Sequence, residues 1–225
     1  MRENLTHVIE DYLKTIYDLS AGSGRATTNQ IAERLGVTPA SVTNMLQKLA
    51  ATQPPLVEYR KHHGVLLTPD GERVALEIVR HHRLIEMFLH QTLGFSWDEV
   101  HDEADRLEHV ISEELEERIA VSLGNPIHDP HGDPIPTRDL HLPASTALTL
   151  DQLRPPQRAK VERVRDADPE LLRYLSELGL TPEVHLTVLS YSPFDNNLHI
   201  QIEGHEAPIV LGSKVTSQVF VDITE

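Results

Sequence analysis

The sequence predicts a mainly α-helical protein with some β structure: an N-terminal winged helix-turn-helix, a helical middle domain and a small C-terminal β-barrel. Three observations lead to this fold class. Apolar residues in the N-terminal half recur at helical spacing between helix-capping residues. Histidines and carboxylates share helix faces in the middle of the chain. In the C-terminal third, β-forming residues alternate or cluster between turns.

Size and composition favour an intracellular protein of several domains. A chain of 225 residues is long enough for two or three small domains, each with its own core. Cysteine is absent, which excludes disulfides and thiolate metal sites. No apolar run approaches the ~20 residues that cross a bilayer, and we expect no secretion leader because residues 1–10 run straight into an amphipathic pattern. We therefore expect a cytoplasmic protein with no membrane partner.

The distribution of charge is compatible with DNA binding, although the net charge is −15. Residues 1–75 hold 8 Lys/Arg and 8 Asp/Glu, residues 76–143 hold 5 and 15, and residues 144–225 hold 7 and 12. Basic groups must lie near phosphate, but the rest of a DNA-binding chain need not be basic. The acidic excess lies in the middle, where bound cations would partly offset it.

The first two helices are predicted by an apolar stripe and by capping residues. The stripe of the first helix consists of Leu5, Ile9, Tyr12, Leu13 and Ile16. A break at residues 21–24 follows it. The second helix begins at Thr27, which has Gln30 at capping-box spacing, and ends at Gly36.

A third helix and a hairpin complete the N-terminal module. Thr38 caps this helix, and Pro39 occupies its first position. Two extended runs, Leu56–Tyr59 and Val65–Leu67, then form a β-hairpin. Two short helices joined by a tight turn and followed by a hairpin describe a winged helix-turn-helix.

The exposed face of the third helix suits the major groove of DNA. Asn44 or Gln47 can pair with adenine, and Ala40 can contact a thymine methyl group. Basic residues of the helix and hairpin can contact phosphate. The predicted DNA-binding residues are Thr38, Pro39, Ala40, Ser41, Thr43, Asn44, Gln47, Lys48, Arg60 and Lys61. The alternative interpretation is an ordinary helical hairpin with a solvated polar face.

The middle domain is predicted to contain three helices. A long helix begins at Thr68-Pro69 and ends at Gly94, and a second begins at Ser96, which is paired with Glu99 in a capping box. A short helix runs from about Ser112 to Gly124. The proline-rich segment from Asn125 to Pro143 is predicted to be a linker or extended crossover.

Histidines and carboxylates on these helices predict cation binding. His101, Asp105, Glu108 and His109 fall within an arc of roughly 100° beside an apolar stripe, and His82 and Glu86 lie one turn apart. Carboxylates brought together away from water repel unless a cation joins them. The alternative interpretation is a solvated acidic helix. Six further histidines are predicted to be loop or surface residues: His62, His63, His81, His128, His131 and His141.

The C-terminal third is predicted to form a small β-barrel with one helix near Pro169–Leu178. Its predicted strands are Val184–Ser190, Leu198–Glu203, Ala207–Leu211 and Val215–Ile223.

Three segments resemble the diphtheria toxin repressor and manganese-dependent regulator family. They are Glu10–Tyr17 (EDYLKTIY), His82–Glu86 (HRLIE) and Val100–His109 (VHDEADRLEH). The resemblance covers about residues 5–142. It implies a winged helix-turn-helix in residues 1–74 and a helical metal-binding and dimerisation domain in residues 75–142. Residues 143–225 resemble the Src-homology-3-like (ferrous-transport-A-like) domain of longer members.

By position, the resemblance implies two metal sites. The primary site would consist of Asp11, Asp105, Glu108 and His109. The ancillary site would consist of His82, Glu86 and His101, with Asp168 and Glu170 as candidate ligands from the barrel. Asn44 falls where iron-responsive members place a base-contacting Gln.

Two departures from the family pattern favour Mn²⁺ first and Fe²⁺ second. Asp11 and Asp105 stand where iron-responsive members have Met and Cys, so the donors are oxygen and imidazole nitrogen. Lys14 stands where some manganese-responsive members have a second first-helix carboxylate, which departs from their binuclear arrangement. No organic cofactor is expected.

The resulting hypothesis is a metal-dependent repressor that binds a palindromic double-stranded DNA operator as a homodimer and controls metal homeostasis. One alternative is a hydrolase or oxidase with a helix-borne di-metal centre, although the chain lacks a His-Glu-x-x-His motif, a glycine-rich phosphate loop and a nucleophile elbow. The other is a metal-independent winged-helix regulator that is gated through the barrel.

Overall fold

A computed structural model describes residues 5–224, with the backbone alone for residues 21–23. The chain divides into two compact units. The first contains the residues up to His81 together with Glu108–Ile111 and Pro136–His141. The second contains His82–Leu107, Ser112–Ile135 and the residues from Leu142 onward.

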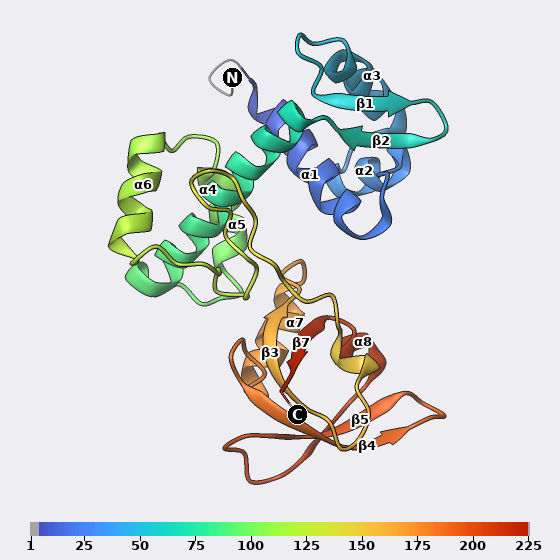
Figure 1. Cartoon of the computed structure of the whole chain (residues 1–225), viewed down its shortest axis with the longest axis vertical. Helices are drawn as coiled ribbons and strands as arrows, with labels where there is room; N and C mark the ends of the chain where they lie inside the picture. The colour runs from blue at the N-terminus through green and yellow to red at the C-terminus, as the bar shows by residue number, and fades with distance from the viewer. Residues whose placement is uncertain (1–4, 225) are drawn as a thin grey trace. The chain divides into compact units, whose positions relative to one another are not determined.

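The first unit contains three helices and a hairpin, followed by the start of a long helix (Figure 1). Its elements are α1 (His7–Ser23), α2 (Thr28–Leu35), α3 (Pro39–Ala50), β1 (Val57–Arg60), β2 (Gly64–Leu67) and the N-terminal half of α4 (Pro69–Leu93). All the elements predicted for this region are present, with the hairpin strands shifted by one residue.

The predicted capping residues begin and end the helices of this unit. Thr27 and Gln30 form a complete capping box at the start of α2, and Gly36 ends that helix with a φ of 65°. Thr38 accepts a hydrogen bond from the backbone N–H of Ser41 at the start of α3. These local bonds satisfy backbone groups that helix ends leave unpaired.

The core of the first unit joins α1 to α3. Three buried residues of α1 belong to the same hydrophobic cluster as three buried residues of α3. They are Tyr12, Leu13 and Ile16 on α1 and Val42, Leu46 and Leu49 on α3. The position of α1 is therefore coupled to the helix predicted to contact DNA, because closely packed interiors transmit displacement.

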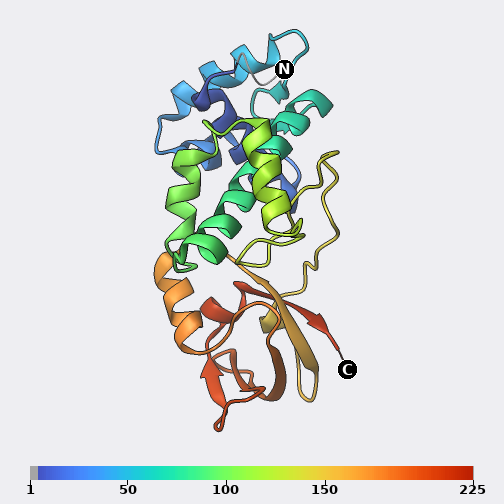
Figure 2. The same cartoon turned by 90° about the vertical axis from the view of Figure 1, so that its left-hand side faces the viewer.

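The second unit contains the C-terminal half of α4, four further helices and a curved sheet (Figure 2), and two of these helices precede the sheet in the chain. These two are α5 (Val100–Leu107) and α6 (Glu113–Ser122). The Ser96 backbone N–H donates to Glu99 Oε2 at 3.2 Å, which is one of the two bonds of the predicted capping box, but the regular helix begins only at Val100. No helix in residues 5–224 combines the length and apolarity needed to cross a membrane.

The sheet has the antiparallel strand order β6-β5-β4-β3-β7. Its strands are β3 (Arg158–Val164), β4 (His185–Ser192), β5 (Asn197–Ile202), β6 (Ile209–Leu211) and β7 (Val219–Ile223). The remaining elements are the 3-10 turn η2 (Leu150–Gln152), α7 (Pro169–Glu177) and α8 (Ser213–Thr216).

Two C-terminal predictions were wrong. Strand β3 was missed because charged residues alternate with its buried Ala159, Val161 and Val164. The strand predicted from Val215 begins only at Val219, because α8 occupies Ser213–Thr216 and its Thr216 hydroxyl donates to the Gly212 carbonyl at 3.3 Å.

The segment predicted to be a linker is packed against strand β3. The N–H of Val164 donates to the His131 carbonyl at 2.9 Å. Gly132 has a φ of 90°, and a side chain there would collide with the backbone of Glu162. Trp97, which precedes α5, lies in the hydrophobic core of the sheet. Within the second unit, the helices and the sheet are thus joined by the linker and by a shared core.

Candidate metal centre

Three metal-binding side chains converge beside α1, and we call them the α1 cluster: Asp11, Glu108 and His109. His109 Nε2 lies 2.8 Å from Asp11 Oδ1 and 3.4 Å from Glu108 Oε1. Asp11 comes from the second turn of α1, whereas the other two follow the C-terminal end of α5. The sequence analysis placed all three in the primary site.

Glu10 orients the imidazole of this cluster. Its Oε2 lies 2.7 Å from His109 Nδ1, and its side chain is buried. A carboxylate on one ring nitrogen leaves the other nitrogen directed at the cluster, an arrangement common behind metal-binding histidines. Against the effect of burial, the hydrogen bonds to Asp11 and Glu10 raise the pKa of His109.

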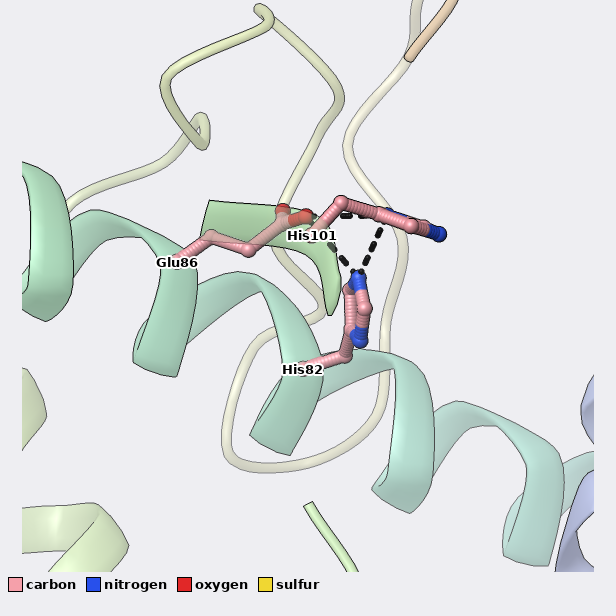
Figure 3. Close-up of side chains that lie close together, drawn as sticks. All are labelled: His82, Glu86 and His101. Carbon is pink, nitrogen blue, oxygen red and sulfur yellow. Dashed lines mark hydrogen bonds and ion pairs between the residues drawn. The ribbon is translucent and has the colours of Figure 1, made fainter. Parts of the chain in front are cut away.

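A second group of three converges between α4 and α5, and we call it the α4–α5 cluster: His82, Glu86 and His101 (Figure 3). Glu86 Oε1 lies 2.9 Å from His82 Nε2 and 3.2 Å from His101 Nδ1. The two imidazole nitrogens are 3.2 Å apart. His82 and Glu86 share one face of α4 because they are one helical turn apart. The sequence analysis placed all three in the ancillary site.

Two residues that the sequence analysis left out complete this region. Asp166 Oδ2 lies 3.4 Å from His101 Nδ1, and His131 Nδ1 lies 3.8 Å from Glu86 Oε2. Glu86, His131 and Asp166 form a further group with the spacing of metal ligands. His131 lies in a loop, as one of the two predicted settings, but its side chain is fully buried, and its Nε2 lies 2.6 Å from the Trp97 carbonyl.

The prediction that His81 is a loop or surface residue was wrong, because it lies on α4. It is buried, and its Nδ1 lies 3.1 Å from the Glu108 carbonyl. It therefore supports the backbone of an α1-cluster residue. Its position on α4, one residue before His82, places it on a different face of the helix.

The electrostatics of the α4–α5 cluster hold a proton where a metal would bind. Burial alone would raise the pKa of the Glu86 carboxyl. The charge of His82 and the hydrogen bonds with His82 and His101 outweigh this effect and hold the pKa well below its usual range. Burial alone would lower the pKa of His101, but its hydrogen bonds to Asp166 and Glu86 outweigh this effect and raise the pKa to about 10. The hydrogen bond from His101 likewise lowers the pKa of Asp166 to about 2. His101 is therefore protonated at neutral pH, and metal binding must release that proton.

The α4–α5 cluster and its neighbours fit a divalent metal ion. Donors about 2.0–2.2 Å from one ion lie about 3.0–3.5 Å apart, which matches the spacing of His82, Glu86 and His101. Glu86 Oε2 and His131 Nδ1 are buried without a hydrogen-bond partner. Buried polar atoms are rarely left without a hydrogen bond, so both atoms are available to bind an ion placed between them. Oxygen and imidazole nitrogen are donors that suit Mn²⁺ and Fe²⁺.

Three predicted ligands lie elsewhere. The Asp105 carboxylate lies 3.2 Å from His82 Nδ1 and 3.8 Å from His101 Nε2, so it adjoins the α4–α5 cluster within the second unit. Asp168 and Glu170 are exposed at the start of α7, where Asp168 accepts the backbone N–H of Glu170 as a helix cap. Asp166, two residues earlier, holds the position next to His101.

The predicted DNA-binding residues lie on α3 and the hairpin. All are exposed except Thr43, which is half-buried and donates its hydroxyl to the Pro39 carbonyl at 3.0 Å. Asn44, Gln47 and Lys48 present free polar groups on the side of α3 opposite its buried face. Arg60 and Lys61 lie at the end of β1 and at the tip of the hairpin.

Three protein-family models match consecutive parts of the chain. Residues 4–65 match the N-terminal DNA-binding domain of iron-dependent repressors. Residues 68–137 match the metal-binding and dimerisation domain of iron-dependent repressors, and residues 148–223 match the FeoA domain.

Similar proteins span nearly the whole chain. The iron-dependent repressor IdeR of Mycobacterium leprae is 34% identical over 216 residues, which cover 90% of this chain and 92% of the relative. The diphtheria toxin repressor of Corynebacterium diphtheriae is 34% identical over 61% of this chain and 60% of its own length. Among solved structures, a manganese-dependent transcriptional repressor in complex with manganese has a TM-score of 0.88 at 39% identity, covering 96% of this chain and 99% of its own. ScaR with bound Zn²⁺ has a TM-score of 0.79 at 34% identity, covering 95% and 98%.

Proposed function

The chain belongs to the iron-dependent repressor family of metal-dependent transcriptional repressors, and we propose that Mn²⁺ held by its two clusters enables it to bind operator DNA. Repression would then follow the cytoplasmic metal supply and regulate metal homeostasis. The observation that carries this proposal is a pair of buried atoms beside the α4–α5 cluster, Glu86 Oε2 and His131 Nδ1, which lie 3.8 Å apart and have no hydrogen-bond partner. A bound cation would satisfy both, and the oxygen and imidazole donors around them favour a hard divalent ion.

The donor chemistry supports Mn²⁺ before Fe²⁺. The α1 cluster offers two carboxylates and one imidazole, and the chain has no thiol. Oxygen-rich sites without sulfur hold Mn²⁺ well, whereas sulfur donors favour softer metals. Asp166 replaces Asp168 and Glu170 as the proposed ligand from the C-terminal domain, because its carboxylate lies 3.4 Å from His101 Nδ1.

The α1 cluster offers a route from metal to DNA within the first unit. A bound divalent ion would join Asp11 and Glu108, whose like charges repel in a partly buried site. Asp11 adjoins Tyr12 and Leu13, which lie in one core with Val42 and Leu46 of α3. Fixing α1 at Asp11 therefore fixes the orientation of α3. A ligand that binds one conformation more tightly shifts the population toward it.

The DNA-binding surface is proposed to be a winged helix-turn-helix presented twice by a homodimer. Asn44 and Gln47 on α3 would contact base edges, and Lys48, Arg60 and Lys61 would contact phosphates. Two such helices need half-sites about 34 Å apart on a palindromic operator. Each α3 must have one orientation to fit its half-site. A displacement of α1 therefore weakens the binding of both α3 helices to the operator.

A DNA-binding titration tests this proposal. The operator is first selected from a random duplex library with the Mn²⁺-loaded protein, and fluorescence anisotropy is then measured with Mn²⁺ and with EDTA. We expect at least a tenfold loss of affinity in EDTA, within the usual range of allosteric coupling. Asn44→Ala is the matched variant, because it should lose operator binding while retaining its metal. Equal affinity in Mn²⁺ and EDTA would contradict the proposal.

The proposal treats the metal as a regulatory ligand and not as a catalyst. The predicted alternative, a di-metal hydrolase or oxidase, would leave the exposed polar face of α3 without a role. Turnover of phosphoester or oxidisable substrates by the Mn²⁺-loaded protein, abolished by Glu86→Gln, would favour that enzyme over a repressor.

A further inference from the structure

The chain contains two runs of four basic or imidazole side chains, and their surroundings differ. Residues 80–83 (RHHR) lie on α4, where Arg80 donates to the Pro136 carbonyl at 2.7 Å and the two histidines are buried. Residues 60–63 (RKHH) end β1 and form the turn before β2, and we call them the wing tip (Figure 1). All four are exposed, and within residues 5–224 their side chains have no hydrogen bond or ion pair.

Acidic side chains of the chain do not neutralise the wing tip, although the net charge is −15. The one acid of the hairpin is Glu58, and its Oε2 lies 3.9 Å from Arg25 Nη2. Helices α1 and α3 pack against the hairpin. In the described part of the chain, the wing-tip histidines pair with none of the titratable side chains of these helices: His7, Glu10, Asp11, Tyr12, Lys14, Tyr17, Asp18 and Lys48. The positive charge of the wing tip is therefore available to an anionic partner.

Backbone hydrogen bonds fix the turn that carries these side chains. The N–H of His63 donates to the Arg60 carbonyl at 2.9 Å. His62 has a φ of 66°, a left-handed conformation that histidine and asparagine adopt more readily than most residues. Below the turn, the N–H of Val65 donates to the Ala26 carbonyl at 2.9 Å, and the N–H of Ala26 donates to the Val65 carbonyl at 3.1 Å. The hairpin is thus held against the segment between α1 and α2.

DNA is the anion that the position of the wing tip favours. Val57 and Val65 of the hairpin lie in one hydrophobic core with Val42 and Leu46 of α3. The wing tip and the exposed face of α3 therefore belong to one packed module. The match to the DNA-binding domain of iron-dependent repressors, residues 4–65, includes the wing tip.

We propose that His62 and His63 extend the DNA-binding surface of the wing and bind backbone phosphates when protonated, so that operator affinity rises as pH falls. This inference rests on the proposed DNA-binding function. Arg60 and Lys61 stay charged at neutral pH, whereas the charge of a histidine side chain changes between about pH 5 and 8. A phosphate beside the ring favours its charged form, so DNA binding takes up protons and strengthens as pH falls through this range.

The test compares operator affinity at about pH 6 and about pH 8 in matched variants. Mn²⁺ is kept in excess, and bound manganese is counted at each pH so that loss of metal does not contribute. We expect wild type to bind about tenfold or more tightly at the lower pH, because each proton taken up contributes up to about tenfold per pH unit. His62→Asn/His63→Gln should lose this gain and keep the wild-type affinity at about pH 8. A wild-type gain in this double variant would overturn the proposal.

A variant with a fixed charge and a salt titration test for contact with phosphate. His63→Lys stays charged at both pH values, so it should bind more tightly than wild type at about pH 8 and gain less on acidification. In wild type, the slope of log affinity against log salt concentration should be steeper at the lower pH by about 0.9 per phosphate contact. Equal slopes at the two pH values would overturn the phosphate contacts. His199→Gln, which replaces an exposed histidine of β5, is the matched control and should behave as wild type.

A duplex without the operator, titrated in EDTA, separates this inference from the proposed function. Phosphate contacts do not depend on base sequence, so acidification should again strengthen binding by wild type more than by His62→Asn/His63→Gln. Equal operator affinity in Mn²⁺ and EDTA would refute the proposed metal control, while this comparison could still be made. The same pH dependence for wild type and the double variant on both duplexes would refute the role of the wing-tip histidines alone.

Discussion

The two clusters differ in how their charges are satisfied without metal. In the α1 cluster, Lys14 and the imidazole of His109 pair with the carboxylates. In the α4–α5 cluster, a proton on His101 joins Glu86 and Asp166, yet Glu86 Oε2 and His131 Nδ1, which lie 3.8 Å apart, have no hydrogen-bond partner. The α1 cluster can therefore be stable both with and without metal, because its ion pairs balance the carboxylates when no metal is bound. The α4–α5 cluster is incomplete without its ligand, so we expect it to bind metal more tightly.

The largest loss of metal affinity is expected when Glu86 is substituted, because His82, His101 and His131 all lie next to its carboxylate. Glu86→Gln keeps the shape but removes the charge shared by His82, His101 and His131. We expect the ion of this cluster to be lost, with an affinity at least 100-fold weaker by isothermal titration, since one carboxylate ligand and its charge are gone. Retention of both Mn²⁺ ions at wild-type affinity would show that this cluster is not the tighter site.

The second-largest effect is expected on the metal dependence of operator binding, which we assign to the α1 cluster and not to the α4–α5 cluster. Asp11→Asn should lose one Mn²⁺ ion and most of the metal dependence of operator binding, because α1 is no longer fixed against α3. We expect about a tenfold or larger decrease in the ratio of affinities with Mn²⁺ and with EDTA. The measurement is anisotropy with the selected operator. Thr6→Ala, at the N-cap of α1 but without a side-chain cap bond, is the matched control and should behave as wild type. A normal ratio for Asp11→Asn would place the regulatory site elsewhere.

The pH dependence sharpens the comparison further. The raised pKa of His101, about 10, means that its ion pairs stabilise the metal-free fold fully below the unfolded pKa near 6.5. That stabilisation is lost as pH rises toward 10. The lowered pKa of Asp166, about 2, gives the opposite dependence of stability on pH. The ion pair of Asp166 stabilises the metal-free fold above about pH 4, and this stabilisation is lost as pH falls toward 2.

Metal binding to the α4–α5 cluster should consequently release about one proton from His101 between pH 7 and 9, and affinity should rise up to about tenfold per pH unit. Titration calorimetry in buffers of different ionisation enthalpy measures this release. His101→Gln should abolish it. A wild-type affinity that does not change with pH would contradict the protonated His101 of the metal-free state.

The smallest effect on metal affinity is expected at Asp168, which the sequence predicted as a candidate ligand from the barrel. Asp168→Ala should cost about 1 kcal/mol of stability through loss of the α7 cap and should leave the metal affinity unchanged. Asp166→Ala should weaken metal binding at the α4–α5 cluster. If the two variants had the reverse effects in calorimetry and thermal melts, the assignment of the C-terminal ligand would be wrong.

The sequence predicted the parts of the site that depend on local spacing. Thr27 with Gln30 marked the start of α2, and the one-turn spacing of His82 and Glu86 placed both on one face of α4. Such patterns are readable because a helix repeats every 3.6 residues. The resemblance added Asp11, which lies 97 residues before Glu108 and which no local pattern connects to it.

The parts that were missed depend on packing between distant segments. His131 lies in a proline-rich segment that reads as a linker, and only its burial beneath Trp97 makes it part of the site. Asp166 and Asp168 are two residues apart at the junction of β3 and α7, where one caps a helix and the other contacts His101. The run Asp129-Pro130-His131-Gly132-Asp133 was the available signal, because it gathers two aspartates and a histidine within five residues.

The central claim is that metal and operator bind the same conformation, so each must strengthen the other by the same factor. The most direct test is to measure the affinity for Mn²⁺ by calorimetry with and without saturating operator duplex. We expect the operator to tighten Mn²⁺ binding by about 10- to 100-fold, equal to the factor by which Mn²⁺ tightens operator binding. Identical Mn²⁺ affinity in the two conditions would contradict the account.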